Sequence, residues 1–521
     1  MNLSKTLKKN ELKYLVVILL LLLSGCKENS EKSNSDSFYF LSEKPSGTND
    51  FEFLFEQISN LQKQDRLVGA EVLIIRNDTI QLHEVVGWSD KEKGQKLQKN
   101  SIYRIRSMTK PIIASAILIL MEDGKISLDD KVAKYIPAFN NAKSDNIKIK
   151  QLLSHTSGLK SHDFEEIGLS KRPYEFETLR EVVDEIGEIG VLKDPGLFYY
   201  SGSGIAVLTE LITITSGMPA EEFIQRRIFR PLKMLDSYTT FHPDLNWATN
   251  LNPAYEWNDS INDFTQYWNA SLEPEYKYFR GHGGVYTTAM DYAKFLSMWL
   301  NNGSFNDNQI LSKEVVSMAQ STVTPLSVTA PFSHQSLAWR VLMQDSTSSK
   351  IGFYMHGGSD GTVGMVYPNE HTIALYFNQS RNHIRNIFEN LMAITDPYIK
   401  YRKWNYNNQF LDQWKEILDS EIHELPSINQ IDSLLGKYEC ISNNRFNSKL
   451  LKINNNLILK NINTGFESKL LHLKESEFIC WFRPPEYGFL SKITFLNDDE
   501  QNRSFTLEWI NKKKFKFNKI E

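Results

Sequence analysis

The sequence lacks a surplus of charge of either sign. Its 521 residues include 59 lysines and arginines against 63 aspartates and glutamates, which gives a formal net charge of −4. The lysines cluster only at the extreme N-terminus, at Lys5, Lys8, Lys9 and Lys13. Binding to nucleic acid through its phosphates needs a concentrated basic surface. We therefore expect no nucleic-acid partner.

The sequence also lacks the histidine spacings of hydrolytic metal centres. Neither His-x-His-x-Asp nor His-Glu-x-x-His occurs among its 11 histidines. These spacings bring metal ligands together on one loop or one helical face. Their absence disfavours a metallohydrolase, and the sequence indicates neither a metal nor another cofactor.

The apolar run behind the lysine cluster, residues 15–23, is too short to cross a membrane, which takes about 20 residues. A basic segment followed by a short apolar core is typical of a signal peptide. Residues 23–26, Leu-Ser-Gly-Cys, resemble the bacterial lipoprotein box, in which the cysteine is lipidated and becomes the mature N-terminus. The resemblance implies export to the cell envelope and an acyl anchor on Cys26. The alternative is that the apolar run is retained as a short membrane anchor.

Lys27 stands where inner-membrane lipoproteins often carry aspartate, which favours the outer membrane, on its periplasmic or its surface face. A chain of this length is too long for a single hydrophobic core, so its length predicts two domains with extensions. The expected order is a signal peptide over 1–25, a polar flexible tether over 26–50, a main domain over 51–400, a connecting helix and linker over 401–429, and a β-rich domain over 430–521.

In the last segment, short alternating stretches predict a small all-β barrel or sandwich. The predicted strands are residues 450–453, 457–459, 469–473, 478–482, 491–495 and 505–509. Two of the three cysteines, Cys440 and Cys480, fall in this domain. Export permits a disulfide between them, and buried thiols are equally compatible with the sequence.

Residues 104–111 contain a candidate nucleophile and a candidate base. Ser107 and Lys110, three residues apart, precede the apolar run 112–121, which ends at Asp123-Gly124 and predicts a buried helix. At this spacing the two side chains share one helical face. A serine hydroxyl becomes a good nucleophile when a neighbouring base takes its proton. A lysine accepts that proton only when neutral, and burial at a helix N-terminus disfavours its ammonium form.

Other segments supply candidates for the surroundings of this pair. Tyr200 precedes an apolar helix predicted over 205–214, and a phenol beside a lysine can carry a proton. The glycines of residues 281–284 are expected to allow a close approach of the backbone to the site. His155 has neither an acid nor a nucleophile at triad spacing, so we interpret it as a structural loop residue.

A last segment, His356-Gly357-Gly358-Ser359, precedes two apolar strands. We expect it on an edge strand that lies against a bound acyl group and offers backbone N–H donors. The Ser-x-x-Lys spacing also occurs at residues 24–27 and 157–160, in the targeting segment and in a polar loop. Ser107 is the one that opens a predicted buried helix.

Taken in order, these motifs resemble the serine β-lactamase and penicillin-binding protein superfamily, in its class C β-lactamase, D-alanyl-D-alanine carboxypeptidase and esterase branch. The resemblance covers residues 51 to about 400 and is carried by Ser107 and Lys110, residues 123–130 and 154–159, Tyr200, residues 231–235 and His356-Gly357-Gly358. It implies an α+β fold, a β-lactamase/transpeptidase-like antiparallel sheet with helices on both faces. It also implies that the β-rich domain is the module often appended to this family.

The resemblance further implies a role for each matching residue. Ser107 takes the place of the acylated nucleophile, Lys110 of its base, and Tyr200 of the tyrosine that passes a proton to the leaving group. His356, Gly357 and Gly358 take the place of the third motif, and the backbone N–H groups of Ser107 and Ser359 that of the oxyanion hole.

Two positions depart from the family pattern. Gly202 stands where an asparagine usually binds a substrate amide, and His356 stands where a lysine usually binds a substrate carboxylate. We therefore expect a serine hydrolase for small ester, amide or peptide substrates. The alternatives are a true β-lactamase or D-Ala-D-Ala carboxypeptidase and, from another class, a non-hydrolytic penicillin-binding sensor or scaffold. Retention of Ser107, Lys110 and Tyr200 argues against the scaffold.

Overall fold

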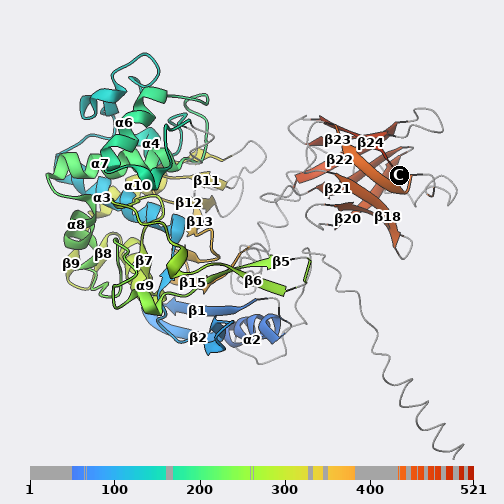
Figure 1. Ribbon diagram of the computed structural model, residues 1–521, viewed down its shortest axis with the longest axis horizontal. Coiled ribbons are helices and arrows are strands. Elements are labelled where there is room, and N and C mark those ends of the chain that lie inside the picture. The colour runs from blue at the N-terminus through green and yellow to red at the C-terminus, as the bar shows by residue number, and fades with distance from the viewer. Residues whose placement is uncertain are drawn as a thin grey trace, which may run out of the picture. The chain divides into compact units, whose positions relative to one another are not determined.

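The protein, seen in a computed structural model, is described over residues 50–381 and 432–520 with short gaps. The gaps are residues 64, 66, 160–167, 259, 262, 327–332, 344–349, 433, 442–446, 454–455, 463–466, 475, 483–488, 497–503 and 510–513. The chain divides into two compact units, which separate within it near residue 413 (Figure 1). The expected signal peptide, Cys26, nearly all of the tether and the linker over 401–429 lie outside the described residues.

A nine-stranded antiparallel sheet is the base of the larger unit (Figure 1). In sheet order its strands are β10 (Thr324–Pro325), β11 (Ser333–Gln335), β12 (Arg340–Met343), β13 (Ile351–Gly357), β14 (Val363–Tyr367), β15 (Thr372–Asn378), β1 (Gly69–Arg76), β2 (Thr79–Asp90) and β3 (Gln95–Lys96). The turn from β1 to β2 uses Asn77 and Asp78, both with positive φ, as a tight hairpin requires.

Both faces of the sheet are covered, because alternate side chains of each strand point to opposite sides. On β15, Ala374 and Tyr376 belong to the core on the side of α2 (Asp50–Lys63). Their neighbours Leu375 and Phe377 belong to the larger core on the side of α9 (Ala289–Leu300). This confirms the α+β class, with helices on both faces of an antiparallel sheet.

Helix α3 (Lys110–Glu122) is buried along nearly its whole length, which explains its unbroken apolar sequence. It packs against α7 (Gly202–Ser216), and Gly124 with φ +68° follows its end. The other α-helices within the described part of this unit are α4 (Ile149–Leu153), α6 (Leu179–Ile189), α8 (Ala220–Ile224) and α10 (Lys313–Ser321). The small sheets pair β16 (Ser380–Arg381) with β5 (Ala254–Asn258), β5 with β6 (Asp263–Trp268), β4 (Tyr103–Arg104) with β7 (Tyr286–Thr287), and β8 (Ser304–Phe305) with β9 (Asn308–Gln309).

The second unit is an eight-stranded antiparallel sheet that closes into a barrel. Its strands are β17 (Gly436–Cys440), β18 (Ser448–Ile453), β19 (Asn456–Asn461), β20 (Glu467–Lys474), β21 (Glu477–Phe482), β22 (Phe489–Leu496), β23 (Ser504–Trp509) and β24 (Lys514–Lys519). The six strands expected from the sequence are β18 to β23, and pairing of β17 with β24 closes the sheet. Its core contains stacked rings, among them Phe505 and Phe517 with centroids 4.4 Å apart.

Cys440 is buried in β17, whereas Cys480 lies in β21, four strands away around the closed sheet. The Cα atoms of a disulfide lie within about 7 Å of each other, less than the width of an eight-stranded barrel. The strand order therefore speaks against a disulfide between these two cysteines.

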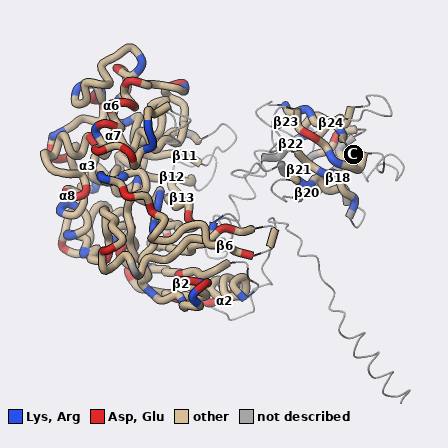
Figure 2. The backbone as a smooth tube through the Cα atoms, viewed as in Figure 1, with Lys and Arg blue, Asp and Glu red and all other residues tan. Residues whose placement is uncertain are grey.

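Basic and acidic residues are interspersed over both units (Figure 2). None of the helices within the described ranges is both long enough and apolar enough to cross a membrane.

Candidate active site

Ser107 and Lys110 meet where a short helix runs into α3. Ser107 lies in the 3₁₀-helix η1 (Arg106–Thr109), and Lys110 is the first residue of α3. Lys110 Nζ donates hydrogen bonds to Ser107 Oγ at 3.0 Å and to the carbonyl oxygen of His282 at 2.8 Å. The Lys110 side chain is buried, so the carbonyl of His282 and the serine hydroxyl fix the position of its amine. This is the contact that proton transfer from Ser107 requires.

The segment that carries His282 packs closely on α7 and α3 at Gly281, which has no side chain. A Cβ atom on Gly281 would lie 1.9 Å from Thr209 Oγ1, and one on Gly284 would lie 2.8 Å from the carbonyl oxygen of Arg280. Real Cβ atoms do not come this close to other atoms. Gly281 thus permits close packing on neighbouring helices, whereas Gly284 is required by the turn that it forms with Arg280.

Tyr200 lies beside Lys110 at the entrance to α7. Lys110 Nζ is 4.9 Å from the centroid of the Tyr200 ring. The ring packs between two histidines, with centroid distances of 4.7 Å to His155 and 6.3 Å to His356. Tyr200 is 37% exposed, so it faces both the buried amine and solvent. The structure thus brings Ser107, Lys110, Tyr200 and His356 together, and it adds His155.

The loop over residues 154–159 supports the segment that carries Tyr200. Three carbonyl oxygens of this loop accept backbone hydrogen bonds from it. Gly158 O accepts from Leu192 N and Lys193 N, both at 3.0 Å. Thr156 O accepts from Gly196 N, and His155 O accepts from Tyr199 N, both at 2.8 Å. Gly158 has φ +79°, and a Cβ atom there would lie 2.4 Å from the carbonyl oxygen of Lys193. From the sequence, we interpreted His155 as a structural loop residue and did not assign it to the site. The structure places it against Tyr200.

The third motif does not lie on an edge strand, as the sequence led us to expect. β13 has β12 on one side and β14 on the other, because β10 to β12 extend the sheet beyond it. In the described residues, however, the pairing with β12 ends at Met355. His356 and Gly357 pair only with β14, opposite Gly364 and Val363. The end of β13 is therefore open on one side, although the strand is internal.

Gly358 brings the end of β13 against the segment that leads into η1. A Cβ atom at this position would lie 2.4 Å from the carbonyl oxygen of Ile105 and 2.4 Å from Thr362 Oγ1. Ser107 is in the first turn of η1, where backbone N–H groups have no partner within the helix. Ser359 follows Gly358 directly. The two expected oxyanion donors thus come from two segments in direct backbone contact.

Both histidines next to Tyr200 are neutral at physiological pH. Burial lowers the pKa of His155 to about 3, and a positive charge on Lys110 acts in the same direction. The same two causes, with a smaller contribution from Arg340, hold the pKa of His356 well below its usual value. His356 Nδ1 lies 3.0 Å from the carbonyl oxygen of Gly357, which can only accept, so Nδ1 carries the proton of the neutral ring. The third motif therefore presents no positive charge near neutral pH.

A buried ion-pair network, which the sequence did not reveal, joins the two oxyanion segments. Asp360 Oδ2 accepts from Arg104 Nε at 2.6 Å and from Arg106 Nε at 3.1 Å, and Asp360 Oδ1 accepts from Tyr267 at 2.7 Å. Burial raises the pKa of Asp360, but Arg106 and Arg104 outweigh it and hold the pKa below its usual value. Arg106 itself has φ +48°. An ionised Asp360, which directly follows Ser359, thus pairs with Arg106, which directly precedes Ser107.

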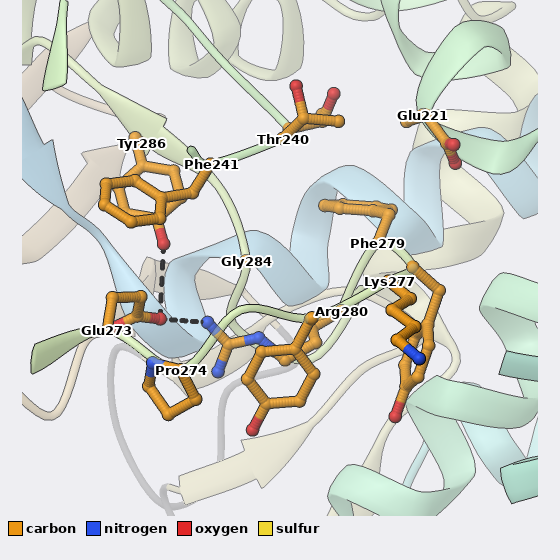
Figure 3. Close-up of a pocket in the computed structure, with 13 residues that line it drawn as sticks. Glu221, Thr240, Phe241, Glu273, Pro274, Lys277, Phe279, Arg280, Gly284 and Tyr286 are labelled. Carbon is orange, nitrogen blue, oxygen red and sulfur yellow. Dashed lines mark hydrogen bonds and ion pairs between the residues drawn. The ribbon is translucent and has the colours of Figure 1, made fainter. Parts of the chain in front are cut away.

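The network continues to a cavity of about 100 Å³ (Figure 3). Its lining consists of residues 221, 239–241, 273, 274, 276–280, 284 and 286. Glu273 accepts from Arg104 NH1 at 2.8 Å, and it also contacts Arg280 and the hydroxyl of Tyr286. Burial raises the pKa of Glu273, while Arg280, Arg106 and Arg104 lower it by more. Neither Ser107 nor Tyr200 lines this cavity. It lies next to the charged support of the site and apart from the candidate nucleophile.

Comparison with known proteins identifies the family. The Beta-lactamase family model matches residues 54–391. The chain belongs to the Beta-lactamase family. Among solved structures, the fold is similar to that of EstCE1, a hydrolase with promiscuous acyltransferase activity. The two structures align with a TM-score of 0.57 and 21% sequence identity, and the alignment covers 67% of this chain and 98% of EstCE1.

Relatives within the Beta-lactamase family carry different names. The putative penicillin-binding protein PbpX of Bacillus subtilis is 30% identical over 46% of this chain and 56% of PbpX. A putative D-alanyl-D-alanine carboxypeptidase of Escherichia coli is 25% identical over 63% of this chain and 84% of that protein. The esterase EstB of Burkholderia gladioli is 27% identical over 33% of this chain and 47% of EstB. The chain thus matches only about half the length of PbpX and of EstB. The names hydrolase, esterase and carboxypeptidase among these proteins support a serine hydrolase.

Proposed function

We propose that the protein is an exported, lipid-anchored serine hydrolase that forms an acyl-enzyme on Ser107 and prefers ester substrates. The observation that carries the proposal is the 3.0 Å hydrogen bond between Lys110 Nζ and Ser107 Oγ at the start of a buried helix. Among known proteins, the esterase EstB and the carboxypeptidase of Escherichia coli support acyl transfer as the chemistry.

The reaction assigns one role to each residue. A neutral Lys110 takes the proton of Ser107 as Oγ attacks the acyl carbon. The backbone N–H groups of Ser107 and Ser359 stabilise the negative charge that develops on the acyl oxygen. Tyr200 gives its proton to the leaving oxygen as the bond between that oxygen and the acyl carbon breaks, and Lys110 passes the proton from Ser107 on to Tyr200. Water then attacks the acyl-serine by the reverse proton path, which releases the acid and restores Ser107.

The preference for esters follows from the charge and the side chains near the nucleophile. His356 is neutral and cannot hold a substrate carboxylate as a lysine would. Gly202, the first residue of α7, has no side chain to bind a substrate amide. Both features penalise β-lactams and peptides, and neither affects a small neutral ester. A D-Ala-D-Ala carboxypeptidase or a β-lactamase is the alternative.

The location is proposed from the sequence of residues 23–26. Lipidation of Cys26 after removal of residues 1–25 would anchor the chain, and Lys27 favours the outer membrane over the inner one. The small-molecule substrate would then be met in the cell envelope.

Labelling with a fluorophosphonate tests the nucleophile. We expect intact-mass spectrometry of residues 27–521 to show one adduct, which peptide mapping places on Ser107 and which the Ser107→Ala variant lacks. An adduct on another serine, or none, contradicts the assignment and favours a non-hydrolytic sensor or scaffold.

Turnover is then compared among short-chain esters, D-amino-acid peptides and a chromogenic cephalosporin. Faster hydrolysis of the cephalosporin than of any ester would favour the β-lactamase.

A further inference from the structure

His155 contacts the segment around Tyr200 at three points. Its carbonyl oxygen accepts the N–H of Tyr199 at 2.8 Å, and its Nδ1 accepts the N–H of Ser201 at 3.2 Å. Its ring packs on the Tyr200 ring with centroids 4.7 Å apart and planes inclined by 42°. One residue thus accepts the N–H groups of the residues before and after Tyr200 and packs against one side of its ring.

These contacts matter because Tyr200 lies outside regular secondary structure. Residues 197–201 belong to neither a helix nor a strand, and α7 begins at Gly202. The Tyr200 side chain is also partly exposed, so surrounding core residues do not enclose it. Its position beside Lys110 therefore depends on the loop that carries His155.

The conformation of His155 is specialised for these contacts. Its backbone is left-handed, with φ +56°, which costs most residues free energy and is tolerated best by glycine and asparagine. Its side chain is 3% exposed. Because Nδ1 accepts a hydrogen bond, the proton of the neutral ring is on Nε2. A protonated ring could not accept from Ser201, so the contact requires the neutral form that burial enforces.

We propose that His155 is a positioning residue that holds Tyr200 in place for proton transfer, through its Nδ1 acceptor and its ring. This inference rests on the proposed role of Tyr200. His155 does not exchange a proton with the substrate in this scheme. It fixes the distance between the phenol and the Lys110 amine.

A pair of substitutions isolates the acceptor. His155→Asn keeps a side-chain acceptor, His155→Gly removes it, and both residues tolerate the left-handed backbone. We expect the kcat for ester hydrolysis to fall about 10- to 100-fold further in His155→Gly than in His155→Asn, because displacements near 1 Å are costly in catalysis. KM should change little. Equal kcat values for the two variants would overturn the proposal.

His371 provides a matched control. Its backbone is also left-handed, with φ +44°. It lies in the turn between β14 and β15, whereas the turn after Gly358 is at the other end of β14. His371→Asn and His371→Gly should have the same kcat.

The comparison at position 155 is then repeated with Tyr200→Phe, which removes the phenol. If His155 acts through Tyr200, the difference between Asn and Gly should disappear in that background. A difference that persists contradicts the proposal.

A readout independent of turnover separates this proposal from the proposed function. With 3-fluorotyrosine at position 200, ¹⁹F NMR should show one narrow resonance for the unsubstituted protein and for His155→Asn. His155→Gly should give a broadened or divided resonance. An unchanged spectrum in His155→Gly refutes positioning by His155, whatever the activity. Failure of Ser107 labelling together with the expected spectra would refute the proposed catalytic role of the site and leave the positioning intact.

Discussion

At the scale of single residues, Lys110 illustrates why charge alone does not make a base. Its Nζ contacts both Ser107 Oγ and the carbonyl oxygen of His282, a geometry that an arginine could imitate in part. A guanidinium, however, stays protonated and accepts no proton. We expect Lys110→Arg to lower the rate of Ser107 acylation by about 100-fold or more. Stopped-flow measurement of acylation by an activated ester gives the rate.

Lys294→Arg serves as a control for this change, because Lys294 pairs with Asp291 on α9. Its acylation rate should equal that of the unsubstituted protein. If Lys110→Arg also retained the full rate, proton removal would have to belong to another group, and Tyr200 would be the first to test.

The two departures from the family pattern give a second prediction at this scale. In Gly202→Asn with His356→Lys, an amide donor and a cation are introduced beside the nucleophile. Each new hydrogen bond is worth about 0.5–1.5 kcal/mol. We expect the ratio of cephalosporin to ester kcat/KM to rise about tenfold or more. Each single variant is measured as well, and a ratio that does not rise in the double variant would contradict our explanation of the ester preference.

At the scale of elements, the contact between β13 and η1 sets the geometry of the proposed oxyanion hole. In Gly358→Ala, the new methyl group would meet the carbonyl oxygen of Ile105, which is backbone and cannot rotate away. We expect kcat/KM for esters to fall about 100-fold, because the two N–H donors move apart. Gly204→Ala on α7 is the control, since its Cβ atom would lie 3.5 Å from the nearest atom, an ordinary contact. Similar activities for the two variants would argue against the oxyanion role.

The elements themselves were largely predictable because their sequence patterns are local. The apolar run after Lys110 predicted α3. Asn77-Asp78 between two largely apolar stretches is typical of a hairpin, which β1 and β2 form. β24 was not predicted, although Lys-Phe-Lys-Phe alternates as a strand with one buried face should.

What the sequence could not provide is contact between distant segments. Asp360 and Arg104 are 256 residues apart in the chain and form one ion pair. The position of β13 inside the sheet depends on β10 to β12, which are short strands without a strong pattern of their own. His155 was assigned to a loop for lack of a partner in sequence, and its partner, Tyr200, is supplied by the fold. The residues of the candidate site were thus recognisable by motif, and their supports were not.

At the scale of the whole molecule, our proposal assigns the location of the hydrolase to the N-terminal segment. We expect Cys26→Ser to leave the chain without lipid and to release it from membranes. Fractionation of cells and metabolic labelling with a fatty acid measure both effects. Lys27→Asp is a companion variant, expected to stay lipidated and to shift toward the inner membrane. Unchanged membrane association of Cys26→Ser would instead mean that residues 15–23 are retained as an anchor.

The closure of the β-rich unit has a consequence for how such proteins arise. Because β17 pairs with β24, the first and last strands of the sheet are neighbours, and the chain enters and leaves the barrel on adjoining strands. A closed sheet also leaves no strand edge to pair with another chain. Such a unit can be gained, lost or exchanged as a whole without unpairing any of its own strands. Its evolutionary history is therefore free to differ from that of the enzyme to which it is joined.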